Sequence, residues 1–254
     1  MKQIPNLFTL LNLFFGCLAI VFMLENSVAI FTYTDGSQYV EMPPQIWMAS
    51  LCIGLAAVID FVDGFVARLF RSTSEMGKQL DSLADLVSFG VAPGIILFEF
   101  LKRSYAQQDN GIEVSMIWLA PALILPCAAA WRLAKFNLDN TQSFSFKGLP
   151  TPAVGLFIAS LPLVYYNYTA DWQVYMLRNK WFLYGIILLF SFLMVSNLPL
   201  MSLKFKDFSV KNNLPKYLLA VISIASIFIF QWLAVPVIVL AYVLISLLFK
   251  NKAA

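Results

Sequence analysis

Four aspartates lie inside or against apolar segments of the chain, where ionised side chains are rare: Asp60, Asp63, Asp81 and Asp85. An ionised Asp at the centre of a bilayer costs roughly 2.5–3.5 kcal/mol, and several in one place also repel one another. Carboxylate oxygens suit Mg²⁺ and Mn²⁺, and a pair of such ions can stabilise the attacking and leaving oxygens of a displacement at phosphorus. The four acids therefore predict a site for Mg²⁺ or Mn²⁺, with carboxylates enough for two ions, that acts on phosphoryl groups.

Helical phasing places these acids on two facing surfaces. At 100° per residue, five residues of one predicted helix share a sector of about 140°: Asp60, Asp63, Gly64, Ala67 and Arg68. In the helix that follows, Gly77, Asp81 and Asp85 recur every four residues and share one face. Solvated acids near a helix end would instead fall at scattered positions with lysines nearby. The regular phasing favours a single site.

The residues interleaved with the acids indicate the ligand. Gly64 and Ala67 leave room for a diphosphate beside the helix, and Arg68 can donate two parallel hydrogen bonds to its oxygens. A cation-coupled transporter would also carry acids inside the membrane. It has less reason to place an Arg and three small residues on the same faces. The pattern therefore favours an enzyme, with a transporter as the alternative from another class.

The composition requires lipid as the solvent. The 254 residues are 60% hydrophobic and 12% charged, with a mean hydropathy of +0.77, whereas soluble domains are about 25% charged. Apolar runs of about 20 residues cross a bilayer, and they predict eight spans in an all-α polytopic bundle: Leu7–Leu24, Ile46–Phe70, Ser82–Leu101, Met116–Phe136, Thr151–Tyr168, Trp181–Leu203, Leu214–Phe230 and Trp232–Phe249. The last two are joined by almost nothing, so six or seven spans are the alternative. No linker or repeat divides the chain, and we expect one domain over residues 1–254.

The basic residues orient the predicted bundle. With the N-terminus in the cytoplasm, 13 of the 17 Lys and Arg residues fall on the inner side. The other four fall outside: Lys102, Arg103, Arg178 and Lys180. By the positive-inside rule, both termini and the aspartates lie on the cytoplasmic side of the inner membrane. The formal charge of +3 is too small to predict a nucleic-acid partner, and the absence of His leaves Asp, Glu, Lys or Tyr as the general base.

The spacing of these residues resembles the signature of the CDP-alcohol phosphatidyltransferase family. Eight positions at fixed offsets over 26 residues match it: Asp60-x2-Asp63-Gly64-x2-Ala67-Arg68-x8-Gly77-x3-Asp81-x3-Asp85. The resemblance implies transfer of a phosphatidyl or phosphoalcohol group from a CDP-linked donor to an alcohol, with release of CMP. It also implies a homodimer and a six-helix core, which we expect over about residues 1–203, with extra helices over about 214–249.

The resemblance further implies a role for each matched residue. The first three aspartates would be the principal metal ligands, while Asp85 would help at the second metal and act as general base. The contacts to CDP-diacylglycerol would come from small, polar and basic residues: Gly64, Ala67, Arg68, Gly77, Asn6 and Thr9. For Asn6 and Thr9, near the start of the first span, capping a helix is the alternative role.

Three further stretches resemble the branch of this family that uses serine as the acceptor. They are IPNLFTLLNL over 4–13, LVSFGVAP over 86–93, and WRLAKFN over 131–137 followed by KGLPTPA over 147–153. The branch implies L-serine as the second substrate. A glycerol 3-phosphate or inositol-type acceptor is the alternative within the family, although a phosphorylated acceptor would need a denser basic pocket.

The carboxylate of serine needs a cation near the metals. Arg132 or Lys135 can supply it, with the polar Asn137 beside them. The alternative is that both basic residues anchor the helix at the cytoplasmic face. Lys135 departs from the branch, where Arg is expected, and a Lys lacks the planar fork that binds a carboxylate through two bonds.

Overall fold

The computed structural model describes most of the chain. The described residues are 4–25, 30–32, 38–40, 43, 45–69, 74–107, 114–138, 146–167, 171–201 and 209–249. Their helices are α1 (Ile4–Leu24), α2 (Gln45–Leu69), α3 (Glu75–Asp85), α4 (Ala92–Ala106), α5 (Met116–Leu119), α6 (Ile124–Leu138), α7 (Thr151–Asn167), α8 (Asp171–Arg178), α9 (Lys180–Val195), α10 (Val210–Phe230) and α11 (Ala234–Leu248). Shorter non-α helical segments join neighbouring helices: the π-helix η1 (Leu86–Val91) and the 3₁₀-helices η3 (Ala120–Leu123) and η4 (Gln231–Leu233).

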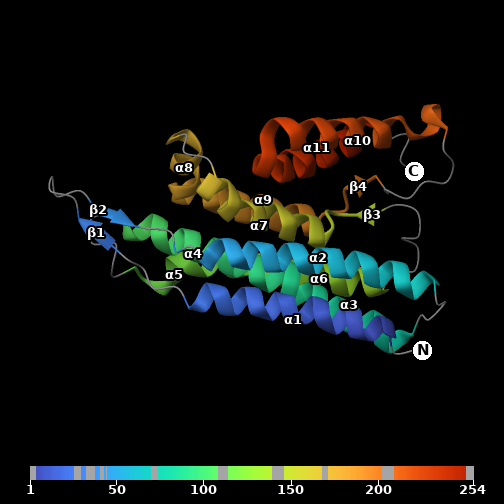
Figure 1. Cartoon of the computed structure of the whole chain (residues 1–254), viewed down its shortest axis with the longest axis horizontal. Coiled ribbons are helices and arrows are strands. Elements are labelled where there is room, and N and C mark those ends of the chain that lie inside the picture. Colours follow the sequence, from blue (N-terminus) through green and yellow to red (C-terminus); the bar gives the residue numbers. More distant parts are fainter. Residues whose placement is uncertain are drawn as a thin grey trace.

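These elements form the all-α polytopic membrane bundle that the sequence predicts. The long helices run side by side, with α3, β3 and β4 at one end of the molecule and β1, β2 and α8 at the other (Figure 1). Segments α3, η1 and α4 form one continuous helical stretch, Glu75–Ala106. The bundle therefore has two distinct ends, and the predicted aspartate site belongs to the end that contains α3.

Fewer helices than the predicted eight spans meet the length and composition of a membrane crossing. Five stretches of the described chain do so: Asn6–Leu24, Gln45–Val66, Glu75–Ala106, Met116–Leu138 and Asn213–Leu248. A sixth is formed if α8 and α9, which bend by 73°, count as one broken span.

The difference in number has two structural causes. Helix α7 has only 17 residues, less than the length that usually crosses a bilayer. Helices α10 and α11 belong to one 36-residue apolar stretch. That stretch turns back at Gln231, whose φ is 45°, so α10 and α11 lie beside each other (Figure 1). Each of the eight predicted spans nevertheless has a helical counterpart.

Two short antiparallel strand pairs, which the sequence did not predict, connect segments that lie between the helices. Strands β1 (Ile30–Thr32) and β2 (Gln38–Val40) are antiparallel between α1 and α2. Strands β3 (Phe146–Lys147) and β4 (Pro199–Leu200) are also antiparallel, and they join the segment before α7 to the segment after α9. The second pair holds the start of α7 close to the end of α9, at the end of the bundle that contains α3.

Segment η1 packs closely against its neighbours. A Cβ at Gly155 of α7 would lie 2.9 Å from the Cα of Phe89, and one at Gly90 would lie 2.9 Å from the Cβ of Ala129 in α6. The π-helix closes with a bond from the Ala92 N–H to the Val87 carbonyl, five residues back. Such turns occur frequently at functional sites. The helix that begins directly after the fourth aspartate is therefore fixed by close backbone contacts.

Candidate active site

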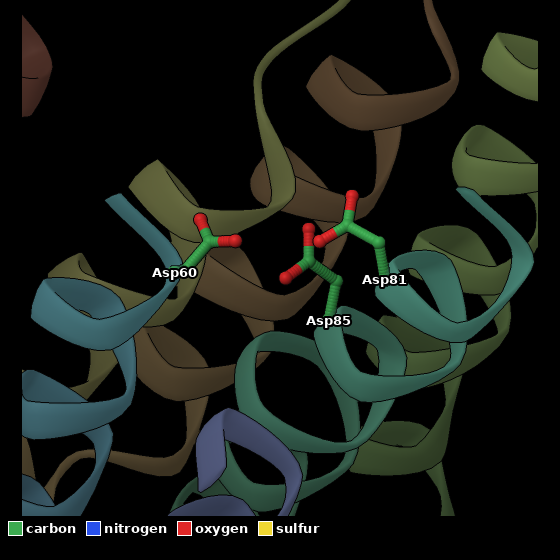
Figure 2. Close-up of side chains that lie close together, drawn as sticks. All are labelled: Asp60, Asp81 and Asp85. Atoms are coloured by element: carbon green, nitrogen blue, oxygen red, sulfur yellow. The ribbon is translucent and has the colours of Figure 1, made fainter. Parts of the chain in front are cut away.

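Three of the four predicted acids meet at one point. Asp60 of α2 and Asp81 and Asp85 of α3 each place a carboxylate oxygen within 4.8 Å of the other two. Figure 2 shows the three side chains extending from the two helices toward a common centre. Asp60 and Asp81 are half-buried, and Asp85 is 8% exposed. Because three carboxylates this close repel one another strongly away from water, the arrangement favours bound cations.

Asp63 lies next to this trio. Its side chain is 7% exposed, and its Oδ2 accepts a hydrogen bond from the Thr9 hydroxyl. Its other oxygen, Oδ1, has no hydrogen-bond partner in the described part of the chain. The charge of Asp63 interacts with those of Asp60 and Asp81. A buried carboxylate oxygen without a donor suits a cation, which agrees with the predicted role of Asp63 as a ligand.

Helix α1 donates hydrogen bonds to two of the aspartates, Asp63 and Asp85. The Asn12 Nδ2 donates to Asp85 Oδ1 over 3.3 Å, and the Asn12 carbonyl accepts from the Ser88 hydroxyl over 3.0 Å. Asn12 is fully buried. Thr9 and Asn12 are three residues apart and therefore share one face of α1. Partners of this kind orient metal ligands.

Asn12 was not among the residues predicted from the sequence. It belongs to a stretch that resembles the serine-using branch, but its role depends on how α1 packs against α3 and η1. The signal in the sequence was the occurrence of Asn6, Thr9 and Asn12 in the first half of a helix that is otherwise apolar.

We expect Asn12→Leu to raise the Mg²⁺ concentration needed for half-maximal activity by about 10–100-fold, because Asp85 loses the donor that orients it. Leucine has a similar size, so packing is largely kept. The measurement is a Mg²⁺ titration of the initial rate. The matched control is Asn167→Leu, which removes an exposed amide at the far end of α7 and should leave the titration unchanged. An unaltered Mg²⁺ requirement in Asn12→Leu would remove the positioning role.

The small residues of the predicted diphosphate pocket fall into two groups. A Cβ added at the exposed Gly64 would meet no atom of the described residues within 4 Å, so the described structure leaves space beside this helix position. A Cβ at Gly77 would lie 3.2 Å from Asn6 Oδ1 and 3.1 Å from Ser74 Oγ. Asn6 and Gly77, both predicted to contact the CDP-linked donor, are thus neighbours. The backbones of Ala67 and Arg68 continue α2, but their side chains lie outside the described residues.

We expect Gly64→Ala to fold normally and to raise the KM for the CDP-linked donor by about tenfold, because the added methyl group enters the space left for the diphosphate. Gly54→Ala is the matched control, since it adds a methyl to the same helix at a position where no described residue lies within 4 Å. Steady-state kinetics of both proteins measure the effect. Equal KM values in the two variants would contradict a diphosphate at Gly64.

Of the three residues predicted to bind serine, Arg132 is the one whose charge interacts with that of an aspartate in the described structure. It is 8% exposed, its Nη1 donates to Thr151 Oγ1 over 2.8 Å, and its charge interacts with that of Asp85. Its Nε has no partner in the described part of the chain. Arg132 therefore combines a buried guanidinium, an available N–H and proximity to the acids.

The other two predicted residues hold helices together. The Lys135 Nζ donates to Asn197 Oδ1 over 2.6 Å, which ties α6 to the segment after α9. The Asn137 carbonyl accepts from Lys78 Nζ over 2.9 Å, and its Nδ2 donates to Ser82 Oγ over 2.8 Å. These bonds connect α6 to α3, so the contacts of Lys135 and Asn137 are mainly between helices.

The donor set fits a divalent metal. All the candidate ligand atoms are carboxylate oxygens, which are hard donors of the kind that Mg²⁺ and Mn²⁺ prefer. Among the described side chains, Arg132 is the cation whose charge acts on Asp85, and one positive charge does not balance four aspartates. The fold and the site together define the class of protein: a polytopic membrane enzyme with an aspartate cluster that can hold a divalent metal.

Comparison with known proteins gives the family. The profile described as CDP-alcohol phosphatidyltransferase matches residues 2–196. The chain belongs to the CDP-alcohol phosphatidyltransferase family. It is 31% identical over 266 aligned positions to a Helicobacter pylori protein named CDP-diacylglycerol–serine O-phosphatidyltransferase, covering 98% of this chain and 96% of the relative.

Relatives from other bacteria have the same name. A Mycobacterium leprae protein is 30% identical, with 95% of this chain and 72% of the relative covered. A Bacillus subtilis protein is also 30% identical, with 65% of this chain and 78% of the relative covered. The resemblance that the aspartate spacing implied is thus confirmed at the level of the family.

Proposed function

We propose that this enzyme transfers the phosphatidyl group of CDP-diacylglycerol to the hydroxyl of L-serine, giving phosphatidylserine and CMP. The observation that carries the proposal is the convergence of Asp60, Asp81 and Asp85 next to a buried Arg132. Relatives over nearly the whole chain bear the name of this reaction. The acids provide for phosphoryl transfer, and the arginine provides for an acceptor that carries a carboxylate.

The proposed cofactor is a pair of Mg²⁺ or Mn²⁺ ions held by Asp60, Asp63, Asp81 and Asp85. When bound, they would neutralise the diphosphate and the charge that develops at phosphorus. Gly64 leaves room for CDP beside α2, and we assign further contacts to Gly77, Asn6, Ala67 and Arg68. We assign a contact to Thr9 as well, and its bond to Asp63 also gives it a role in positioning that carboxylate.

Asp85 is the proposed general base. It accepts the proton of the serine hydroxyl as the hydroxyl oxygen forms a bond to the phosphorus that carries diacylglycerol. The bond between that phosphorus and the bridging oxygen of CDP breaks, and CMP leaves with the electron pair. Asn12 holds Asp85 Oδ1 from one side, and the charge of Arg132 acts on the same carboxylate. We propose that these contacts orient the carboxylate and that its other oxygen, Oδ2, accepts the proton.

Arg132 is the proposed contact of the serine carboxylate. Its bond to Thr151 fixes one end of the guanidinium, and its Nε stays available as a donor. A guanidinium can bind a carboxylate through parallel bonds that also orient the hydroxyl. Lys135 and Asn137 support this side of the site through their bonds to Asn197 and Ser82.

We expect Arg132→Gln to raise the KM for serine about 10–100-fold and to leave the KM for CDP-diacylglycerol within about twofold, because a charge-assisted bond to the carboxylate is lost. Lys102→Gln removes a positive charge at the opposite end of the bundle and serves as the control, with little change in either constant. Two-substrate kinetics measure both. A parallel rise in both KM values for Arg132→Gln would contradict a specific contact to serine.

An acceptor competition assay tests the choice of serine. Purified enzyme is given CDP-diacylglycerol, labelled serine and an excess of unlabelled glycerol 3-phosphate or inositol, and each lipid product is identified. We expect phosphatidylserine to remain the product. A predominant product from glycerol 3-phosphate or inositol would reassign the acceptor and leave the family unchanged.

We further infer that the site and both termini face the cytoplasm, at the inner membrane of the cell. The inference is supported by the 13 Lys and Arg residues that fall on that side, against four on the other. We also propose a single catalytic domain over residues 1–254, with a core of about 1–203. Assembly as a homodimer remains a prediction from the family resemblance.

The helices beyond the core have a proposed supporting role. From α11, the Tyr242 hydroxyl donates to the Met201 carbonyl over 2.9 Å, and the Ser246 hydroxyl accepts from the Met201 N–H over 3.2 Å. Met201 directly follows β4, which pairs with the strand before α7. This connection would restrict the movement of Thr151 at the start of α7 and, through the hydrogen bond between them, that of Arg132.

A further inference from the structure

The four basic residues that the sequence assigns to the outer side of the membrane gather at one end of the bundle. Lys102 and Arg103 lie in the last turns of α4, and Arg178 and Lys180 flank the bend between α8 and α9. The Ser104 hydroxyl donates to the Arg178 carbonyl, which joins the two places. This end contains α8, opposite the end that contains α3 (Figure 1). Residues 75 or more positions apart in the chain thus converge, far from the aspartates.

A pocket of about 630 Å³ lies at this junction. Its lining includes Arg178 and Lys180, the polar Ser104 and Gln107, and the aromatic rings of Tyr175 and Trp181. The described lining contains two cations and no acidic side chain. Glu99, the acid nearest in sequence on α4, is already paired with Arg103 and Lys102. The charge of the pocket favours an anion.

The two cations are held in place by aromatic side chains. Arg178 donates through Nη2 to the Tyr165 hydroxyl over 2.7 Å, and the Lys180 Nζ lies 4.7 Å from the centre of the Tyr105 ring. Because these contacts fix both cations of the pocket lining in position, little ordering is needed when an anion binds, which indicates a prepared site.

Exposed aromatic rings place this junction at the surface of the membrane. Trp172, Tyr175 and Trp181 are 59%, 72% and 72% exposed, and they lie on α8 and at the start of α9. Trp and Tyr concentrate at the level of the lipid headgroups, where a ring is partly in lipid and its polar atom is in water. Helix α8 departs from the axis of α9 by 73°, as expected for a short helix that follows the interface.

We propose that this pocket binds the phosphate of an anionic phospholipid, at the membrane face opposite the aspartates. Arg178 and Lys180 contact the phosphate, Ser104 and Gln107 contact the polar part of the headgroup, and Tyr175 and Trp181 line the path of the acyl chains. The bound lipid would hold α4, α8 and α9 together. The site is independent of the transfer reaction and of its acceptor.

The test measures lipid retention by the full-length protein in detergent, using native mass spectrometry with added phosphatidylglycerol, phosphatidylcholine or inorganic phosphate. We expect one phosphatidylglycerol to be retained in preference to phosphatidylcholine, and inorganic phosphate at the same concentration not to displace it. Lys180→Gln should weaken the retention about tenfold, as the loss of one charge-assisted contact. Lys102→Gln is the matched control, because Lys102 is a basic residue of the same end that is absent from the described pocket lining.

Three results would overturn the proposal. Equal retention of phosphatidylcholine would show that the pocket does not select an anion. Displacement by inorganic phosphate would show that the ligand is a free anion and not a lipid. Equal retention by the Lys180→Gln and Lys102→Gln proteins would place the bound lipid elsewhere. Wild-type elution in size-exclusion chromatography confirms that both variants are folded.

Discussion

Replacing Asp85 by Asn should lower the turnover number for CMP release by at least about 10²–10⁴-fold at saturating substrates and Mg²⁺. Asparagine keeps the shape of the side chain but removes the group that accepts the proton from serine. It also removes one of three carboxylates that lie within 4.8 Å of one another. Both losses act on the chemical step, so the reduction should appear in the turnover number more than in either KM.

The matched control is Glu75→Gln. Glu75 is exposed and lies in the first turn of the same helix α3. The substitution makes the same change from carboxylate to amide, but outside the cluster of three aspartates. We expect near-normal turnover in this protein. An Asp85→Asn enzyme with more than about a tenth of wild-type turnover would assign the proton transfer to another group.

Removing divalent metal should reduce activity to the background of a catalyst-free sample. The aspartate oxygens repel one another without a cation, and the diphosphate of the donor adds further negative charge. Activity should return with Mg²⁺ or Mn²⁺ added back after dialysis against EDTA. Equilibrium dialysis with Mn²⁺ should detect about two ions per chain in the wild type and fewer in Asp81→Asn.

The chelated protein also needs a structural control. Its circular dichroism should stay helical, because hydrogen bonds within each helix do not depend on the metal. Full activity in the presence of excess EDTA, with no metal remaining by elemental analysis, would contradict the assignment of the aspartates as ligands.

The sequence predicts which aspartates share a helix face, because helical phasing depends on local geometry. Asp81 and Asp85 are four residues apart, so any α-helix places them on one face. Asp60 reaches them because a short connection returns the chain to the same end of the bundle. Asp63 shares the sector of Asp60, yet its Oδ2 is directed to Thr9 of α1. That detail depends on how α1 packs, which the spacing of the acids does not contain.

Other features depend on contacts between distant segments, and the sequence did not predict them. The π-helix η1 follows Asp85, and the Ala92 N–H donates to the Val87 carbonyl within it. Its Phe89 packs directly against Gly155 of α7. Apolar periodicity does not distinguish this turn from an α-helix. Helix α7 has only 17 residues, and α10 and α11 belong to one 36-residue apolar stretch, so fewer separate stretches meet the length of a crossing than the apolar runs in the sequence.

The pocket between α4, α8 and α9 illustrates the same division. Counting basic residues on each side identified four exceptions to the positive-inside rule, but their positions in the sequence gave no reason for them. The structure brings Arg178 and Lys180 to the end of α4, where Ser104 contacts the Arg178 carbonyl. The count of charged residues therefore identified the basic residues, whereas the pocket that they line depends on how α8 and α9 pack against α4.

The most direct test of the proposed reaction follows both products of one purified preparation. Wild-type enzyme in nanodiscs receives CDP-diacylglycerol, labelled L-serine and Mg²⁺, and CMP and labelled lipid are quantified over time. We predict equal amounts of CMP and phosphatidylserine, no CMP when serine is omitted, and neither product from the Asp81→Asn enzyme. Release of CMP without serine, or no phosphatidylserine with either Mg²⁺ or Mn²⁺, would contradict phosphatidyl transfer to serine at the aspartate site.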